Sequence, residues 1–346
     1  MARTYLLILF FLIIYQIVNH WAILSAPYDV LFWENRFSRS QLIFGGKAEV
    51  KLSDYDIYAI AGYKYLHGDD PLKLDPVSPP LGKLIIGTGI TVFRSAIIMN
   101  LIFGLMALVL LYILSRQLRL SPSLALVALI LIFLDPVFRE SLFSSNLDIF
   151  QLVFLCLSLV AFFRGPRWFF ISALTIGFMM ATKFYLTGLL WFWIVLAYLF
   201  LRGNYRTFMQ FIYTLPFVAL GFILPYLPSL LHNPDFIGFL RFQRWLTSWW
   251  AGNARVPWGG IFPIIFYGEW HTWWDKRVIL PVPEWTWLWP ASTVAGLISF
   301  VKNPRSLIWL WLAGYLLFMS VTSAFPRYLV LFLPFAVIQS LTLLRV

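Results

Sequence analysis

The sequence has little charge and almost no cysteine. Only 12% of its residues are charged, against about 25% in soluble domains. Its one cysteine, Cys156, excludes an intrachain disulfide and a cluster of thiolate ligands. The four histidines are scattered along the chain without the spacing of metal ligands. Disulfide-stabilised domains and Cys/His metal centres are therefore excluded.

Apolar residues take the place of the missing charge. They make up 61% of the chain, whereas soluble domains contain about 45–50%. The sequence therefore predicts an all-α, polytopic integral membrane protein that forms a single unit over 1–346. Ten apolar segments are candidate transmembrane helices, although several are short, so tilt, re-entry or merging at 122–135 and 168–201 stays open. They are 4–24, 96–114, 122–135, 148–163, 168–182, 185–201, 207–230, 287–301, 306–322 and 328–344.

The net charge of +11 points to membrane lipids and not to nucleic acid. Most arginines and lysines fall at alternate ends of the apolar segments, as the positive-inside rule describes. This pattern predicts that both termini are cytoplasmic. The outer side then receives 25–95 and 231–286, together with nearly every acidic residue.

The first outer loop concentrates acids and predicts two short helices. Ser53 is a suitable N-cap for a helix over 54–66, and a second helix is expected over 81–93 after a Pro-Pro pair. On a helix Asp54 and Asp56 point about 200° apart, so at most one faces a given site. Read as a loop, the same two acids could share a cation. As plain first-turn acids they complement the helix dipole.

Four stretches resemble a known family. Asp54 is followed by Tyr58-Ala59, then by DPVSPPLGKLIIG; LSRQLRLSPSLALVALILIFLDP, SSNLDIF and PRYLVLFLPF come later. This succession resembles the GT-C glycosyltransferases of the protein O-mannosyltransferase family and their aminoarabinose-transferring relatives. Those proteins carry D-E-x-x-[FY]-[GA] ahead of H-P-P-L-G-K or K-P-P.

The resemblance implies a glycosyltransferase with a GT-C-like bundle. The donor would be a polyprenyl-phosphate sugar, with mannose as the expected sugar, and the acceptor hydroxyl would belong to a protein, a lipid or a glycan. Asp54 would be the base, and transfer would proceed with inversion on the outer face of a prokaryotic plasma membrane. No cofactor follows from the resemblance, although a divalent cation at the acids stays open.

Two positions depart from the family pattern. Tyr55 replaces the second acid of D-E, unless Asp56 takes its place as a supporting acid. Ser78 replaces the His or Lys before Pro-Pro and so removes a contact to phosphate or acceptor. Asp75, Ser78 and Asn146 are expected at the acceptor or in the surrounding loop.

The remaining candidates lie at the outer ends of apolar segments. Asp148 either supports the site, as the family's Leu-Asp does, or caps its own helix. Lys83 and Arg327 run against the positive-inside bias, and Lys183 lies between two apolar segments; all three are predicted to bind the donor phosphate. Snorkelling is the alternative for Lys83 and a plain helix turn for Lys183. Glu140 is read as an interface partner of Arg139.

Two other functions stay open. A lipid-linked-sugar flippase or transporter would need polar residues deep in its helices, but the apolar segments are nearly uncharged. A degenerate transferase acting as a partner subunit would explain the changes at Tyr55 and Ser78.

Overall fold

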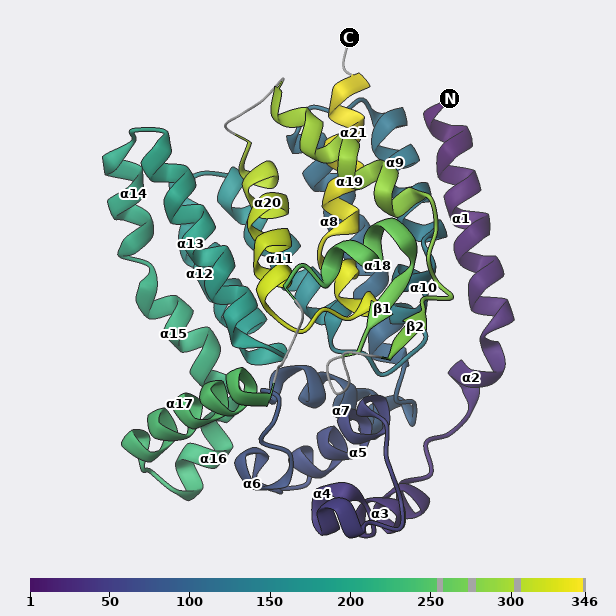
Figure 1. The fold of residues 1–346 in the computed structure, drawn as a ribbon, viewed down its shortest axis with the longest axis vertical. Coiled ribbons are helices and arrows are strands. Elements are labelled where there is room, and N and C mark those ends of the chain that lie inside the picture. Colours follow the sequence, from purple (N-terminus) through teal and green to yellow (C-terminus); the bar gives the residue numbers. More distant parts are fainter. Residues whose placement is uncertain (254–257, 273–277, 302–305, 345–346) are drawn as a thin grey trace.

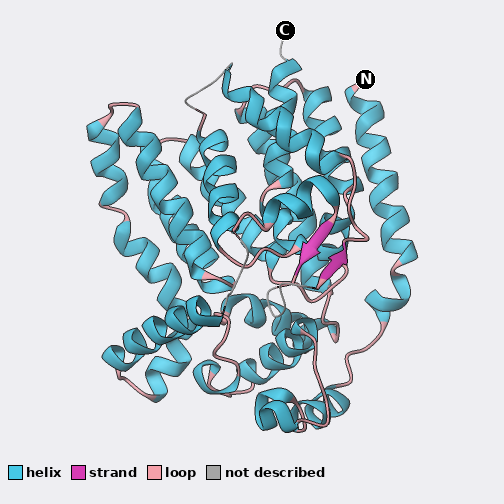
Figure 2. Ribbon diagram, viewed as in Figure 1, coloured by secondary structure: helices cyan, strands magenta, loops and turns pink. Residues whose placement is uncertain are grey.

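The computed structural model describes residues 1–253, 258–272, 278–301 and 306–344 of the chain. Its regular structure is almost entirely helical (Figure 2). Long helices run alongside one another with both termini at one end, and short helices cover the opposite end (Figure 1). The predicted helical class is confirmed. The termini lie at the same end, as the charge pattern predicted, although which side of the membrane they face stays a prediction.

The bundle follows the apolar segments of the sequence closely. Its helices are α1 (Ala2–Asn19), α8 (Ile98–Gln117), α9 (Pro122–Leu134), α11 (Asp148–Phe163), α12 (Phe169–Thr182), α13 (Tyr185–Leu201), α14 (Tyr205–Ile212), α15 (Leu215–Ile223), α19 (Leu288–Ile298), α20 (Leu307–Val321) and α21 (Leu333–Leu341).

The number of membrane spans is not confirmed at ten. Within the described residues, four helical stretches are long and apolar enough to cross a membrane, namely Ala2–Asn19, Ile98–Gln117, Tyr205–His232 and Pro326–Leu344. A fifth would combine α9 with α10 (Pro136–Leu142), which bend by 75° at the break between them. Several other apolar helices are shorter, so length alone does not decide whether they span the bilayer.

Mostly short helices form the layer opposite the termini, with α17 (Phe236–Asn253) as its long member. The others are α2 (Trp21–Ser25), α3 (Val30–Ser38), α4 (Gln41–Phe44), α5 (Asp54–Leu66), α6 (Pro71–Leu74), α7 (Leu81–Phe93) and α16 (Leu227–His232). The bounds predicted for α5 and α7 are confirmed. A Cβ on Gly62 would lie 2.0 Å from the Lys83 carbonyl oxygen, so glycine is what allows α5 and α7 to touch.

The large outer loop has its own structure. It contains α17, α18 (Ile261–Tyr267) and a small hairpin of β1 (Glu269–His271) and β2 (Ile279–Pro281), drawn in magenta in Figure 2. The Trp270 indole in β1 donates to the Ala324 carbonyl at 2.9 Å. The hairpin thus holds the segment that leads into the short helix η5 (Pro326–Leu331).

Helix α11 runs through the centre of the core, with nearly every side chain buried. It packs against α8, α12 and η5. Its first residue, Asp148, therefore lies at the place where the bundle meets the layer of short helices.

Candidate active site

Asp54 begins α5 with a carboxylate that its own helix does not use. The Ser53 hydroxyl accepts from the Asp56 amide, and Asp56 in turn accepts from the Ser53 amide at 3.1 Å, which completes a capping box. The predicted Ser53 cap is confirmed. Asp56 Oδ2 is bonded to Ser53 at the cap, and the role of Asp56 as a supporting acid stays a prediction. The Asp54 side chain is 52% exposed.

Arg327 is the partner of Asp54. Its Nη2 donates to Asp54 Oδ2 at 2.6 Å, over a separation of 273 residues. The Nε of the same guanidinium is buried, has no hydrogen-bond partner among the described residues and lies 4.0 Å from Asp148 Oδ2. Because buried donors normally find a partner, this nitrogen is a hydrogen-bonding capacity of the guanidinium that the described residues leave unused.

Asp148 and Lys183 form a second pair next to the first. Lys183 Nζ lies 2.7 Å from both Asp148 oxygens, and the Asp148 side chain is 1% exposed. Asn146 Oδ1 accepts from the Asp148 amide at 3.0 Å. The alternative that Asp148 caps its own helix is wrong, since Asp148 is the first residue of α11, the N-cap position is Leu147, and the Asp148 carboxylate bonds the lysine instead.

Burial controls the charge of Lys183. The residue lies in the short connection between α12 and α13, where burial lowers its pKa to about 8 although Asp148 opposes the shift. Arg327 also acts to lower it. The ammonium group lies 4.4 Å from the centre of the Tyr328 ring, a distance at which cation–π attraction is appreciable.

The four side chains therefore form one group, here called the charged cluster: Asp54, Asp148, Lys183 and Arg327. Arg327 lies in the 3₁₀ helix η5. Two backbone carbonyls of η5 accept hydrogen bonds from α20: the Tyr315 hydroxyl donates to Tyr328 O and the Trp311 indole to Leu331 O, both at 3.0 Å. The packing of α20 thus fixes the position of the arginine.

Glu140 is a member of this region that the sequence did not indicate. Its Oε1 accepts from the Tyr55 hydroxyl at 3.0 Å. The expected pairing with Arg139 is wrong, because no ion pair within 4 Å joins the two side chains. Burial raises the pKa of Tyr55 above its usual value, and Glu140 adds to the shift. The Tyr55 hydroxyl therefore keeps its proton and remains a donor.

Asp75 and Lys83 lie in a separate group, here called the buried clamp. Lys83 Nζ donates to Asp75 Oδ2 at 2.7 Å, to the Asp75 carbonyl at 2.8 Å and to the Tyr65 hydroxyl at 3.2 Å. Its side chain is fully buried. These contacts occupy all the donors of an ammonium group. A phosphate contact for Lys83 stays a prediction, but the structure gives this lysine a different set of partners.

Ser78 contributes a hydroxyl near the clamp. Its Oγ is buried and makes no hydrogen bond among the described residues. Among the described residues, no hydrogen bond or ion pair joins Ser78 or Asp75 to the charged cluster, so their predicted place at the acceptor or in the surrounding loop stays a prediction.

Within the described residues, no three His, Cys, Asp or Glu side chains converge in a way that could hold a metal ion. Asp56 is bonded to Ser53 through its side chain.

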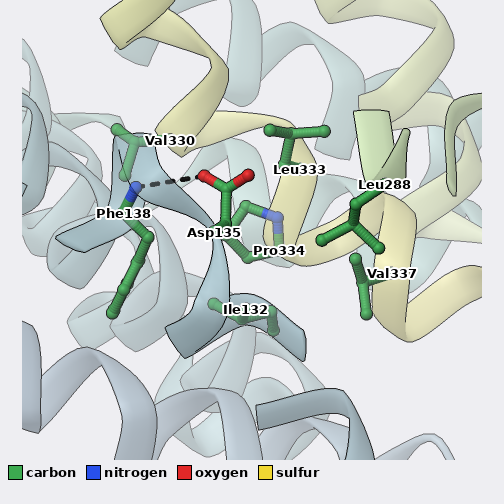
Figure 3. A pocket seen from close by; sticks show the side chains of 8 residues that line it. All are labelled: Ile132, Asp135, Phe138, Leu288, Val330, Leu333, Pro334 and Val337. Carbon is green, nitrogen blue, oxygen red and sulfur yellow. Dashed lines mark hydrogen bonds between the residues drawn. The ribbon is translucent and has the colours of Figure 1, made fainter. Parts of the chain in front are cut away.

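An apolar pocket lies elsewhere, at the bend between α9 and α10 (Figure 3). Asp135 is its polar member, and both carboxylate oxygens are engaged. Oδ1 accepts from the Phe138 amide at 3.1 Å and Oδ2 from the Trp289 indole at 2.6 Å. Asp135 therefore stabilises the bend by capping α10.

The sequence model of the dolichyl-phosphate-mannose-protein mannosyltransferase family matches residues 77–251. That range is a little over half of the 346 residues. The chain belongs to this family. The resemblance inferred from PPLGK and the motifs around it is confirmed, and members of the family are membrane glycosyltransferases.

Solved structures agree on the GT-C fold. The crystal structure of ArnT from Cupriavidus metallidurans bound to undecaprenyl phosphate is similar with a TM-score of 0.63 and 15% identity, over 92% of this chain and 59% of that one. The apo oligosaccharyltransferase from Archaeoglobus fulgidus is similar with a TM-score of 0.54 and 14% identity, over 98% and 50%. The chain thus spans about half to three fifths of these longer proteins. A comparison with curated proteins found no match.

Proposed function

We propose that this protein transfers a monosaccharide, expected to be mannose, from a polyprenyl phosphate to an acceptor hydroxyl, with inversion. The observation that carries the proposal is the charged cluster, in which a half-exposed carboxylate lies against an arginine that has an unused buried donor. Membership of a mannosyltransferase family and the likeness to an undecaprenyl-phosphate-bound structure support this choice of donor.

Arg327 and Lys183 are the groups assigned to the donor phosphate. Both carry positive charge beside the exposed Asp54, and Asp148 holds Lys183 in place through both oxygens. A guanidinium binds phosphate through several donors at once. The proposal leaves Lys83 in the buried clamp with Asp75, where it holds α5 against α7.

Asp54 is assigned as the base. As the acceptor oxygen attacks the anomeric carbon, its proton passes to the Asp54 carboxylate, and the bond between that carbon and the phosphate oxygen breaks. The electron pair leaves with the polyprenyl phosphate, whose charge Arg327 and Lys183 stabilise. A phosphate that accepts hydrogen bonds from Arg327 competes with Asp54 for the guanidinium. Donor binding therefore weakens the Arg327–Asp54 ion pair and frees the Asp54 carboxylate to act as the base.

The acceptor class and the membrane are part of the proposal. Protein, lipid and glycan hydroxyls would all fit a base at the outer edge of the bundle. The layer of short helices is proposed to face the outside of a prokaryotic plasma membrane, in accord with the acids that it carries.

The test compares two acids at neighbouring positions. Purified protein in nanodiscs is given radiolabelled polyprenyl-phosphate mannose and a mixed acceptor pool, and sugar transfer is followed. Asp54→Asn should lower the transfer rate by about 100-fold or more while donor binding persists. The control, Asp56→Asn, should transfer at close to the wild-type rate because we assign Asp56 to the cap of α5 alone.

Three outcomes would contradict the proposal. Sugar transfer by Asp54→Asn at the wild-type rate would exclude Asp54 as the base. Movement of the labelled lipid across proteoliposomes without transfer would indicate a flippase or transporter. Co-purification with an active homologue, without activity of its own, would indicate a partner subunit.

A further inference from the structure

Tyr55 stands where the family motif carries an acid, and the structure brings an acid to it from elsewhere in the chain. The Tyr55 hydroxyl donates to Glu140 Oε1 at 3.0 Å, across 85 residues. Asp56, the acid next in sequence, is bonded to Ser53 instead. Of these two carboxylates, only Glu140 lies against Tyr55.

Glu140 is close to the charged cluster without being paired in it. Tyr55 follows Asp54 in the chain, and the Arg327 guanidinium carbon lies 5.8 Å from the centre of the Tyr55 ring. Arg327 and Asp148 interact electrostatically with Glu140, as does Glu284 from the segment before α19. Glu140 thus lies beside the arginine assigned to phosphate, on the side of Tyr55.

One oxygen of Glu140 is available to a ligand. Tyr55 uses Oε1, and Oε2 accepts no hydrogen bond from the described residues. Oε2 is also not among their buried side-chain atoms that lack a partner, and Glu140 as a whole is half-buried. A carboxylate can accept up to about four hydrogen bonds. It also repels phosphate, so it suits the neutral, hydroxyl-bearing part of a ligand whose phosphate lies on Arg327.

We propose that Glu140 is a specificity-determining residue whose Oε2 accepts a hydrogen bond from a hydroxyl of the donor monosaccharide, and that Tyr55 is the positioning residue that holds it. The identity of the ligand rests on the proposed function. In this arrangement α10 supplies the carboxylate that the Tyr55 position lacks.

The test measures donor binding, so that it can succeed or fail independently of sugar transfer. The probes are polyprenyl-phosphate mannose, its monodeoxy analogues and bare polyprenyl phosphate, each titrated against protein in nanodiscs. Wild-type protein should bind one monodeoxy analogue about ten- to a hundredfold more weakly than the full donor, because that analogue leaves the carboxylate unpaired. Glu140→Ala should bind the full donor as weakly as that analogue.

Three further variants separate recognition from a structural tether between α5 and α10. Glu140→Gln keeps an acceptor oxygen and should retain part of the discrimination, and Tyr55→Phe should lose part of it. Glu284→Gln is the matched control, since Glu284 approaches Glu140 without bonding to Tyr55, and should discriminate like wild type. None of the four variants should bind bare polyprenyl phosphate more weakly than wild type, and the Glu140 variants should bind it at least as tightly because a carboxylate near the phosphate is removed.

Two results would overturn the proposal. One is that Glu140→Ala distinguishes the monodeoxy analogues as wild type does. The other is that Glu140→Ala weakens the binding of bare polyprenyl phosphate as much as the binding of the full donor. The Tyr55–Glu140 bond would then be a structural tether between α5 and α10. If the predicted binding pattern appears but no sugar is transferred, the proposed function fails and this assignment stands.

Discussion

Two groups of acids and bases lie in the same region of the molecule, and they differ in how completely they are paired. In the buried clamp, Lys83 is fully buried and its contacts to Asp75 and Tyr65 account for every donor. In the charged cluster, Asp54 is 52% exposed, and the Arg327 Nε has no hydrogen-bond partner in the part of the chain that the structure describes. A closed set of bonds can only hold structure, whereas an open set can exchange partners with a ligand.

The same difference separates the energetic roles of the two groups. A buried ion pair is weak evidence of net stability, but removing one partner leaves an uncompensated charge and is strongly destabilising. An exposed pair contributes little to stability because water and salt screen it. The clamp should therefore matter for folding, and the Asp54–Arg327 pair for chemistry.

The largest expected effect is at the clamp. Lys83→Met leaves the Asp75 carboxylate buried without its cation and should lower the free energy of unfolding by about 3–5 kcal/mol. Thermal unfolding of purified protein in detergent measures the loss. Adding Asp75→Asn to this variant should recover part of it, because no charge is then buried. A Lys83→Met protein as stable as wild type would show that the clamp is not structural.

The next effect concerns pH and the open cluster. Lys183 has a pKa of about 8 in the folded protein against an ordinary 10.5, so it loses its charge as the pH rises above about 8. Transfer should then fall up to about tenfold per pH unit, because the phosphate loses one of its cations. Lys183→Arg should extend activity to higher pH. A flat rate between pH 8 and 10 would contradict this role.

Loss of folding stability through Lys183 would not explain such a loss of transfer. Between pH values of about 8 and 10.5, the pKa values of Lys183 in the folded chain and of an ordinary lysine, the unfolded chain binds one more proton than the folded chain, so the free energy of unfolding increases with pH. This gain in stability is lost as the pH falls from 10.5 through about 8. Thermal unfolding over the same pH range provides the control, since loss of transfer should occur without a fall in Tm from this residue.

The smallest effect is at the cap of α5. Ser53→Ala removes the side-chain bond to the Asp56 amide and should cost about 1 kcal/mol of stability. At a temperature where the variant is folded, the rate of sugar transfer should change little, because the ion pair between Asp54 and Arg327 does not depend on the Ser53 side chain. A hundredfold loss of transfer would show that the cap sets the position of the base.

Local structure around the site could be predicted from the sequence because its causes are local. Ser53 as a cap and the bounds of α5 and α7 follow from neighbouring residues, and both are as predicted. The opposite directions of Asp54 and Asp56 follow from helix geometry. Arg327 was singled out by its place against the positive-inside bias and Lys183 by its place between two apolar segments, and both lie against Asp148 in the structure.

The pairings could not be predicted, since they join distant segments. Nothing near Asp54 indicates a partner 273 residues away, and Glu140 looked like a partner for its neighbour Arg139. Lys83 and Lys183 both resembled phosphate ligands in the sequence. Their roles diverge only when folding places one against Asp75 and the other against Asp148.

The most direct measurement compares Asp54→Asn with Asp75→Asn, recording Tm and the rate of transfer per folded molecule for each. The account predicts that Asp54→Asn loses about 100-fold or more in transfer at an unchanged Tm. Asp75→Asn should lower Tm and retain transfer in the folded fraction. The opposite pattern, with transfer lost at Asp75 and kept at Asp54, would contradict the division between an open cluster for chemistry and a closed clamp for the fold.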